Sequence, residues 1–497
     1  MRTENESQIT CQLRAVKTEG GQLVLEGSVR LLLPVPQQDE RLPADVERRV
    51  EAAGQEFKRW MYRQLMEKLD VELILSKRGG KDDEGFVCHG RRTMTFKTVF
   101  GTVQVSRHRI VHTADQSSEI PAATAWDTPR QVTITQGLID ATCDAMLQES
   151  SRKSLRHVEE RAGEPGLLGR VTVLNLVHQE GRQLRDALQH RAKEVFEADA
   201  EAARCFLPPV AEPTPDEQPL PDEVEETWPA LVGFPGAPAV DVVEPEQPRH
   251  VDADTVMVQA DEVCVHAQAS TGCKEVRVYN AVVSTAERTW YFSEGSAQGL
   301  IFLVGSLLAT LEVHRGQLRL LFVNDGARWI RDWFNGIDVK AKSMVLCWYH
   351  LAKRCFQDLG MACGQRRAEE IGQKVLGHLW ESRFEEALEV LAGHRVEMRN
   401  RPALDRIVEY IRNRRPYLPN YSARREAGLW IASNRVEKLN DWTVSQRCKH
   451  RGMDWTRDGV VALAVLESAR RNDDLPEWRR HRNLNPWRGA TLTQQAA

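Results

Sequence analysis

Three acidic residues that lie far apart in the chain stand where the local sequence could aim them at a metal ion. Asp325 follows the apolar run LRLLFV after one residue and precedes a glycine, which predicts a carboxylate at the carboxyl end of a buried strand. Asp261 lies inside the strand-like run VMVQADEVCVHA, although acidic residues are poor strand formers. Glu437 lies one turn into a helix that starts near Ser433. Carboxylate oxygens from several directions suit a pair of Mg²⁺ or Mn²⁺ ions ~3.5–4 Å apart, the arrangement used for phosphoryl transfer.

Each carboxylate also has an ordinary structural explanation. The Asp-Gly pair could simply cap a strand-to-helix turn, Asp261 could be an exposed charge at a sheet edge, and Glu437 could be a surface helix charge. Because strand side chains alternate, Asp261 and Glu262 face opposite ways and only one can face a site. Asn440 follows Glu437 by three positions and shares its helix face. The metal interpretation depends on the three carboxylates occurring together.

The elements that would position these carboxylates form a mixed α/β pattern over residues 251–490. β-rich runs predict three closely spaced strands, and two further strands follow, each after a helix. An almost wholly helical segment, about 351–430, then precedes the helix that carries Glu437, so we expect a mixed sheet with a helical insertion. The predicted strands are Val256–Ala267, Glu275–Val283, Arg288–Phe292, Leu318–Val323 and Ser343–Cys347, and the predicted helices outside the insertion are Ala297–Glu312, Ala327–Phe334, Asn434–Arg447 and Gly459–Arg471.

The N-terminal part predicts an α+β region. We expect a helical region over 1–80, with an amphipathic helix at Asp45–Leu69, and a DNA-binding region over 81–200. Alternation across Gly85–Val111 predicts two short strands that turn at Gly101. Three helices follow: Val132–Gln148, Ser151–Ala162 and Thr172–Arg191.

The last two of these helices could form a helix-turn-helix over residues 151–190. Ser151 and Thr172 are candidate N-caps. The connection Gly163–Val171 is longer than the usual tight turn, and two helices joined by a Gly/Pro loop are also common as plain packing, so both interpretations stay open. As a DNA reader, the second helix would present four polar side chains to a groove: Asn175, His178, Gln179 and Arg182.

The net charge of −4 hides an uneven distribution. Pro208–Arg249 holds 11 of the 22 prolines and ten acidic residues against one basic residue, which predicts an acidic linker or surface loop that does not pack. Outside this segment the chain carries a net charge of +5. Arg395–Arg482 has 20 Lys and Arg against 12 Asp and Glu, which favours polyanion binding, although a solvated helical surface explains it equally well.

Composition argues against several other classes of protein. Hydrophobic residues at 41% and charged residues at 28% are ordinary for a soluble globular protein. The ten cysteines include no Cys-x-x-Cys pair, so neither a disulfide framework nor a zinc ribbon is supported. The start of the chain lacks the apolar core of a secretory signal, and the most apolar run, Gly299–Leu311, is shorter than a membrane span of ~20 residues. We expect a buried helix there and a cytoplasmic bacterial protein of two or three domains.

The chain resembles the DDE transposases of the retroviral-integrase superfamily in the order of its elements. A strand with Asp261 comes first, then a strand that leads to Asp325, a helical insertion and a helix with Glu437. Longer strings resemble the ISKra-type transposases of bacterial insertion sequences over about Gly85–Ala200 and Val251–Arg480. The string around Glu437 is the most specific of them. These strings are FKTVFGTVQVSRHRI, ADEVCVHAQ, FVNDGARWIRDWF, LCWYHLAKRC and RREAGLWIASNRVEKLNDWTVSQRCKHRGMDWT.

The resemblance implies a ribonuclease-H-like catalytic fold in which Asp261, Asp325 and Glu437 hold two Mg²⁺ or Mn²⁺ ions and catalyse the reaction. It also implies that Cys347 and His350, which match a Cys-x-x-His signature of related transposases, support the active site. As a pair they cannot complete a zinc site, and buried packing is the alternative. DNA contacts are expected from cations and one aromatic near the third carboxylate: Arg435, Lys438, Arg447, Lys449, Arg451 and Trp455.

The function that this implies is a DNA transposase that binds the terminal inverted repeats of its element, cleaves there and joins the ends to target DNA. Bringing the two ends of the element together implies a homodimer or larger assembly on double-stranded DNA. We expect this assembly in the cytoplasm, on the nucleoid, and we expect no membrane partner. Two alternatives remain: a metal-dependent nuclease of the same fold that cuts but does not join, and a catalytically retired transposase that acts as a DNA-binding protein.

Overall fold

The computed structural model describes residues 8–17, 23–32, 42–78, 85–128, 130–207, 251–450, 453–485, 487 and 490. The chain divides into two units, Met1–Glu180 and Gly181–Ala497, with the boundary inside helix α5 (Arg170–Ala198). The second half of α5 and helix α6 (Ala200–Phe206) therefore belong to the second unit, whereas we predicted one region over 81–200. The predicted acidic linker, 208–249, lies outside the described residues.

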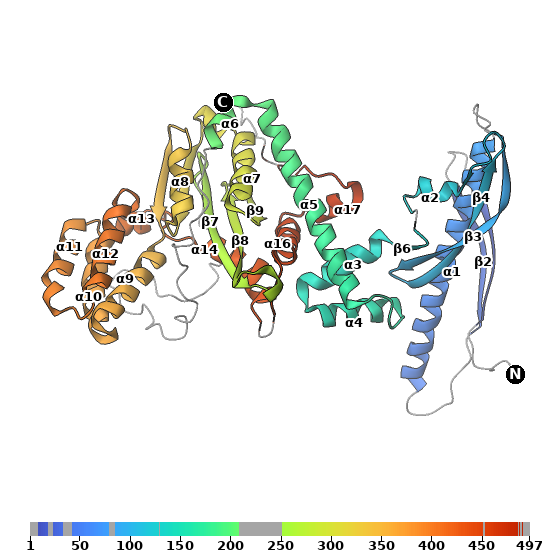
Figure 1. Ribbon diagram of the computed structural model, residues 1–497, viewed down its shortest axis with the longest axis horizontal. Helices are drawn as coiled ribbons and strands as arrows, with labels where there is room; N and C mark the ends of the chain where they lie inside the picture. The colour runs from blue at the N-terminus through green and yellow to red at the C-terminus, as the bar shows by residue number, and fades with distance from the viewer. Residues whose placement is uncertain are drawn as a thin grey trace. The chain divides into compact units, whose positions relative to one another are not determined.

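The second unit is built on a five-stranded sheet with β7 (Thr255–His266) at its centre (Figure 1). β8 (Glu275–Ser284) and β9 (Thr289–Glu294) extend it on one side as antiparallel strands. β10 (Arg319–Asn324) and β11 (Lys342–Leu346) extend it on the other side as parallel strands. The predicted mixed α/β pattern is confirmed.

Helices cover both faces of this sheet. The apolar run predicted as a buried helix is α7 (Ala297–Thr310), most of which is buried. Among the described helices, none has both the length and the apolarity that crossing a bilayer requires. The remaining α-helices described in this unit are α8 (Arg328–Gly336), α9 (Trp348–Cys363), α10 (Gln365–Trp380), α11 (Phe384–Gly393), α12 (Arg401–Arg414), α13 (Tyr421–Glu426), α14 (Asn434–Asn440), α15 (Gln446–Cys448), α16 (Arg457–Arg471) and α17 (Leu475–His481).

The central strand shows different side chains to the two faces of the sheet. Gln259 and Asp261 contact α14, whereas the indole nitrogen of Trp329 in α8 donates a hydrogen bond to Glu262 on the opposite face. The opposite orientations predicted for Asp261 and Glu262 are therefore confirmed, and α14 lies over the face that carries Asp261.

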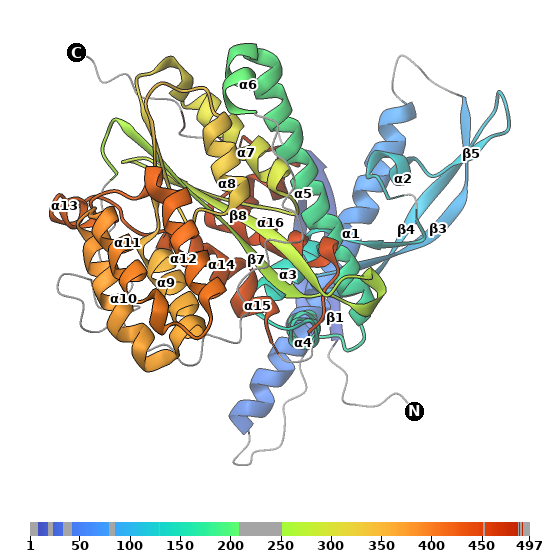
Figure 2. The same ribbon diagram turned by 60° about the vertical axis from the view of Figure 1, so that its left-hand side comes forward.

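Helices α9–α13 form the insertion between β11 and α14, and they lie side by side in Figure 2. Their core includes an aromatic group in which the ring of Trp348 lies 4.7 Å from that of Trp380 and 4.9 Å from that of Tyr421. The same hydrophobic cluster contains Val323 of β10 and Val345 of β11, which anchor the insertion to the sheet. The predicted helical segment is confirmed.

In the first unit, a long helix accompanies two sets of strands. The region predicted as helical, 1–80, is helical only over α1 (Leu42–Arg78), because β1 (Gln8–Lys17) and β2 (Leu23–Leu32) form an antiparallel pair before it. Both segments alternate apolar and polar residues over part of their length, which is the strand period rather than the helix period. The predicted helix at Asp45–Leu69 lies within α1.

The predicted hairpin is also present. β3 (Phe86–Thr98) and β4 (Gly101–His112) pair antiparallel, with Gly101 at a φ of +104° beside the turn. The helix predicted at Val132–Gln148 begins only at Gln136, because Val132–Ile134 pairs with β3 as the short strand β6. The remaining elements described here are β5 (Ser118–Glu119), α2 (Pro121–Ala125) and α3 (Gln136–Gln148).

The two helices of the predicted helix-turn-helix are present, but their predicted caps are wrong. α4 (Ser151–Ala162) has the predicted bounds, yet Ser150 occupies the N-cap position and makes no capping hydrogen bond through its side chain. Thr172 lies within the first turn of α5 and cannot cap its start. Gly163 ends α4 with a φ of +63°, a conformation that favours glycine.

Candidate metal centre

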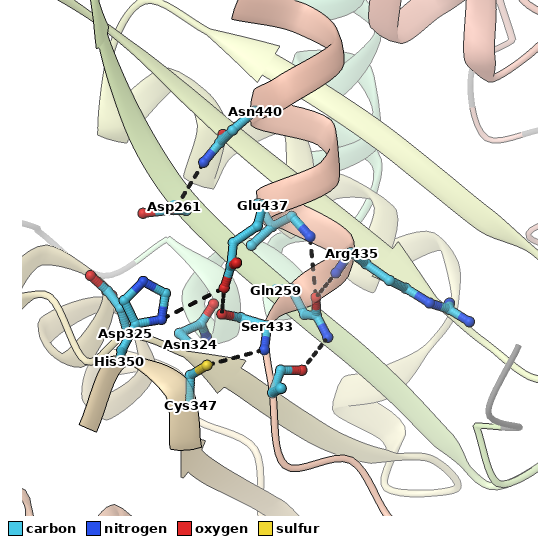
Figure 3. A network of polar contacts seen from close by, with 12 residues as sticks. Gln259, Asp261, Asn324, Asp325, Cys347, His350, Ser433, Arg435, Glu437 and Asn440 are labelled. Carbon is cyan, nitrogen blue, oxygen red and sulfur yellow. Dashed lines mark hydrogen bonds and ion pairs between the residues drawn. The ribbon is translucent and has the colours of Figure 1, made fainter. Parts of the chain in front are cut away.

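Asp261 of β7, Asp325 of the turn after β10 and Glu437 of α14 lie near one another beside the sheet (Figure 3). β7 and β10 pair in parallel as far as Val258 and Phe322, and each aspartate stands three residues beyond that pair. Glu437 comes from the first turn of α14, which packs against β7 and β8. The pairing of β7 with β10 therefore places Asp261 and Asp325 at the same position along neighbouring strands, and α14 adds Glu437.

Like charges crowd Asp261. Burial and, next, the carboxylate of Asp325 raise the pKa of Asp261 well above its ordinary value, and Glu437 adds to the increase. His350 is the neighbour that lowers it. A divalent cation would relieve this repulsion, since metal binding favours the deprotonated carboxylate.

Asn440 holds Asp261 through a hydrogen bond. Its Nδ2 donates to Asp261 Oδ2 at 2.7 Å, and the backbone N–H of Glu262 donates to Asp261 Oδ1 at 2.8 Å. Asn440 Oδ1 in turn accepts from Asn280 Nδ2 at 2.7 Å, and Asn280 Oδ1 accepts from Ser293 Oγ at 2.5 Å. This chain of buried polar groups fixes the Asn440 amide with its N–H toward Asp261.

A glutamine of β7 positions the helix that carries Glu437. Gln259 is fully buried, and its Oε1 accepts from the backbone N–H groups of Arg435 at 3.0 Å and Val436 at 3.2 Å. Ser433 occupies the N-cap position of α14 but makes no capping hydrogen bond through its side chain, so the side chain of Gln259 supplies the cap from the sheet. Ser433 Oγ instead donates to Glu437 Oε1 at 3.1 Å.

Asp325 has a structural role besides facing the site. Its Oδ1 accepts from the backbone N–H of Ala327 at 2.9 Å, which stabilises the turn into α8. Gly326 has a φ of +77°, and its carbonyl accepts from Arg414 Nη2 at 3.2 Å. Arg414 belongs to the insertion, and burial lowers the pKa of its guanidinium. The insertion therefore contacts the turn that presents Asp325.

Cys347 and His350 lie next to Glu437, and their support of an active site stays a prediction. Cys347 is buried between β11 and α9, and its sulfur accepts from the backbone N–H of Ser433 at 3.4 Å. His350 Nδ1 lies 3.7 Å from Glu437 Oε1. Burial alone would lower the pKa of His350, but Cys347, Glu437 and Asp325 outweigh it and raise that pKa well above its ordinary value.

The most compact set of potential ligands is a mixed one. Within the described parts of the chain, one group of three such residues has all its ligand atoms within 4.8 Å of one another: Cys347, His350 and Glu437. Asp261, Asp325 and Glu437 do not form such a compact group among the described residues.

Two residues predicted to contact DNA are buried. Trp455 packs inside the unit, where its Nε1 donates to the carbonyl of Cys448 at 3.0 Å and its backbone N–H donates to the carbonyl of His266 at 2.9 Å. Arg447 is also buried, with its guanidinium 5.6 Å from the centre of the Trp455 ring. Neither side chain presents a surface to DNA here, which argues against base stacking by Trp455 and phosphate binding by Arg447.

The other cations near Glu437 differ from one another. Arg435 Nη1 donates to Ser284 Oγ at 2.6 Å, and burial lowers the pKa of its guanidinium, so it ties α14 to the sheet rather than facing outward. Lys438 is partly exposed and its Nζ lies 3.7 Å from a carboxylate oxygen of Asp441. Lys449 is exposed, and Arg451 lies outside the described residues. DNA contacts by Lys438 and Lys449 stay predictions.

The residues predicted to read a groove lie along α5. Asn175 and Gln179 are exposed, and His178 is half-buried. Arg182, which belongs to the second unit, is exposed and donates to Asp458 at 3.0 Å. Their contact with DNA stays a prediction.

Sequence reasoning missed three residues that build the site. Gln259 could have been found, because the strand period places it on the same face as Asp261. Asn280 and Arg414 carry no local signal, since one lies on a neighbouring strand and the other in the distant insertion.

No protein-family model matches the chain, and no curated protein does either. The resemblance to transposases therefore rests on the quoted strings and on the three carboxylates.

Proposed function

We propose that this protein is a DDE transposase that cleaves DNA at the ends of its element and joins those ends to target DNA. The observation that carries the proposal is the gathering of Asp261, Asp325 and Glu437 from a central strand, the end of its parallel neighbour and a later helix. The raised pKa of Asp261 supports it, because burial and, next, the nearby carboxylate of Asp325 raise that pKa.

A ribonuclease-H-like fold for residues 251–490 belongs to the same proposal. It is supported by the strand order β11-β10-β7-β8-β9, with three antiparallel strands in succession followed by two parallel ones. The placement of α9–α13 between Asp325 and Glu437 matches the interruption that the resemblance implies.

Asp261, Asp325 and Glu437 would hold two Mg²⁺ or Mn²⁺ ions, since all three offer the hard oxygen donors that these ions prefer. When bound, the ions supply activation of the attacking water or 3′-hydroxyl and stabilisation of the leaving oxygen. Asn440 keeps one oxygen of Asp261 oriented, and the cap from Gln259 fixes the start of the helix that carries Glu437. These contacts preorganise the ligands before DNA arrives.

DNA binding would involve both units, with the helix pair α4–α5 as the proposed reader of terminal inverted repeats. The insertion adds positive charge, because residues 351–430 contain 15 Lys and Arg against 11 Asp and Glu. Binding through phosphates should weaken steeply with salt. Synapsis of two DNA ends calls for a homodimer or larger assembly, acting in the cytoplasm on the nucleoid.

The proposal is tested by an excision and integration assay in which a marker lies between the gene's own flanking sequences, with Mg²⁺ or Mn²⁺ present. We expect joined products from the unaltered protein and none from Asp261→Asn, Asp325→Asn or Glu437→Gln, each of which should still bind the flanking DNA. Asp332→Asn is the matched control, because Asp332 is exposed on α8 and its carboxylate lies 3.7 Å from Arg328.

Each outcome discriminates between functions. Joined products that require Asp325 support the transposase. Cleavage without joining indicates a nuclease, and DNA binding without either reaction indicates a retired transposase. Joining by Asp325→Asn would remove that residue from the catalytic set.

A further inference from the structure

Cys347, His350 and Glu437 form a cluster of three different donor types. A sulfur, an imidazole nitrogen and a carboxylate oxygen all lie within 4.8 Å of one another. They come from the β11–α9 junction, the first turn of α9 and the first turn of α14 (Figure 3). The chemistry proposed above uses the oxygens of Glu437 but has no direct use for the sulfur or the nitrogen.

This donor set differs from the one that suits Mg²⁺. Hard ions such as Mg²⁺ and Ca²⁺ take oxygen ligands, whereas thiolate and imidazole favour Zn²⁺ and related transition metals. Zinc bonds of ~2.0–2.3 Å in a tetrahedral site place ligand atoms on the order of 3.3–3.8 Å apart. His350 Nδ1 and Glu437 Oε1 are already 3.7 Å apart, so small side-chain movements would complete three of four positions.

The surroundings hold these donors ready. The backbone N–H of Ser433 donates to Cys347 Sγ at 3.4 Å, and Ser433 Oγ donates to Glu437 Oε1 at 3.1 Å. His350 Nδ1 is buried and has no hydrogen-bond partner among the described residues. A buried ring nitrogen without such a partner, aimed at a carboxylate and next to a thiol, is a group that a metal ion would satisfy.

We propose that Cys347, His350 and Glu437 bind one thiophilic transition-metal ion of the Zn²⁺ class. On binding, the Cys347 thiol releases its proton to solvent and the thiolate sulfur bonds the metal, so no oxidation or reduction occurs. The site shares Glu437 with the proposed pair of hard ions. Where the proposed function holds, occupation by Zn²⁺ withdraws Glu437 from catalysis and inhibits DNA joining.

Cobalt titration of the full-length reduced protein tests the site directly, because Co²⁺ bound to thiolate gives a sulfur-to-metal charge-transfer absorption that oxygen ligands do not give. We expect this absorption in the unaltered protein, its removal by stoichiometric Zn²⁺ and its persistence in excess Mg²⁺. Cys347→Ser should abolish it. Cys273→Ser, at an exposed cysteine of the same unit, should retain it.

Two further variants keep the test meaningful if Cys347→Ser folds poorly. Glu437→Gln changes an exposed residue and should weaken Co²⁺ binding at least tenfold, while Asp261→Asn should leave the sulfur-to-metal absorption unchanged. Absence of the absorption from the unaltered protein, or its presence in Cys347→Ser, would overturn the proposal. Unchanged Co²⁺ affinity in Glu437→Gln would exclude the shared ligand.

The binding measurement needs no catalysis, so the two proposals fail separately. A thiolate-to-cobalt absorption without DNA joining would support the metal site and refute the transposase proposal. DNA joining without that signal does the reverse.

Discussion

Replacing Gln259 with leucine should loosen the start of helix α14, because leucine keeps the buried volume but removes the cap. The backbone N–H of Arg435 would lose its acceptor, the N–H of Val436 would keep only the carbonyl of Ser433 at 3.1 Å, and the carbonyl of Ala432 would lose a donor at 3.2 Å. Loss of a helix N-cap costs ~0.5–2 kcal/mol, and a buried unsatisfied polar group costs ~1–3 kcal/mol.

A local destabilisation of ~1–2 kcal/mol corresponds to amide exchange about 5–30-fold faster, since ~1.4 kcal/mol is a factor of ten. Hydrogen exchange followed by mass spectrometry should show this acceleration in peptides covering α14, with peptides of α10 as the internal reference. Gln268→Leu is the matched control. Gln268 lies two residues beyond the end of β7, and its side chain donates a hydrogen bond to the carbonyl of Asp454 at an exposed position.

Unchanged exchange in α14 of Gln259→Leu would refute the view that the sheet caps this helix. Equal acceleration in Gln268→Leu would show that the effect is not specific to the cap.

Three further predictions follow from the same contacts. Asn440→Leu removes the donor 2.7 Å from Asp261 and should raise the Mg²⁺ concentration for half-maximal DNA cleavage ~10–100-fold; an unaltered Mg²⁺ dependence would exclude this positioning role. Burial and Asp325 raise the pKa of Asp261, so a proton competes with the metal ion for this carboxylate. The affinity for Mg²⁺ should therefore rise with pH over a range above ~3.9, the usual pKa of aspartate. Titration calorimetry should show that the Mg²⁺ affinity of Asp261→Asn depends less on pH than that of the unaltered protein. Gly181→Ala places a Cβ 2.5–2.7 Å from atoms of Ala462, so it should reduce the free energy of unfolding by ~1–3 kcal/mol and lower the midpoint of thermal unfolding. Gly377→Ala is the control, because Gly377 also lies within a helix but has open space around it, and this variant should be as stable as the unaltered protein or more so. Equal midpoints for the two variants would contradict the close approach of α5 and α16.

The sequence by itself predicted the elements whose patterns are local. The alternation around Asp261 predicted that Asp261 and Glu262 face opposite sides of the sheet, as they do. The apolar run before Asp325 predicted a buried strand, and this run forms most of β10. Helix α4 has the predicted bounds because its polar and apolar residues repeat with the helix period. In the same way, the short apolar run in α7 was correctly interpreted as a buried helix.

Local patterns were insufficient where backbone pairing competed with helix formation. Val132–Ile134 joined β3 as a strand although the residues after it are helical, and the first strands of the chain were missed beside the stronger signal of α1. In each case a partner strand supplied hydrogen bonds that the segment's own sequence does not reveal.

Only the tertiary structure decided which polar side chains serve the candidate site and which are buried elsewhere. Trp455 looked suited to stacking on DNA, but its backbone pairs with His266, almost two hundred residues earlier, and its ring is buried. Gln259 looked like an ordinary strand residue, yet it caps a helix that begins 175 residues later. The periodicity of a segment fixes which face a side chain occupies, whereas its partners depend on which distant segment packs against that face.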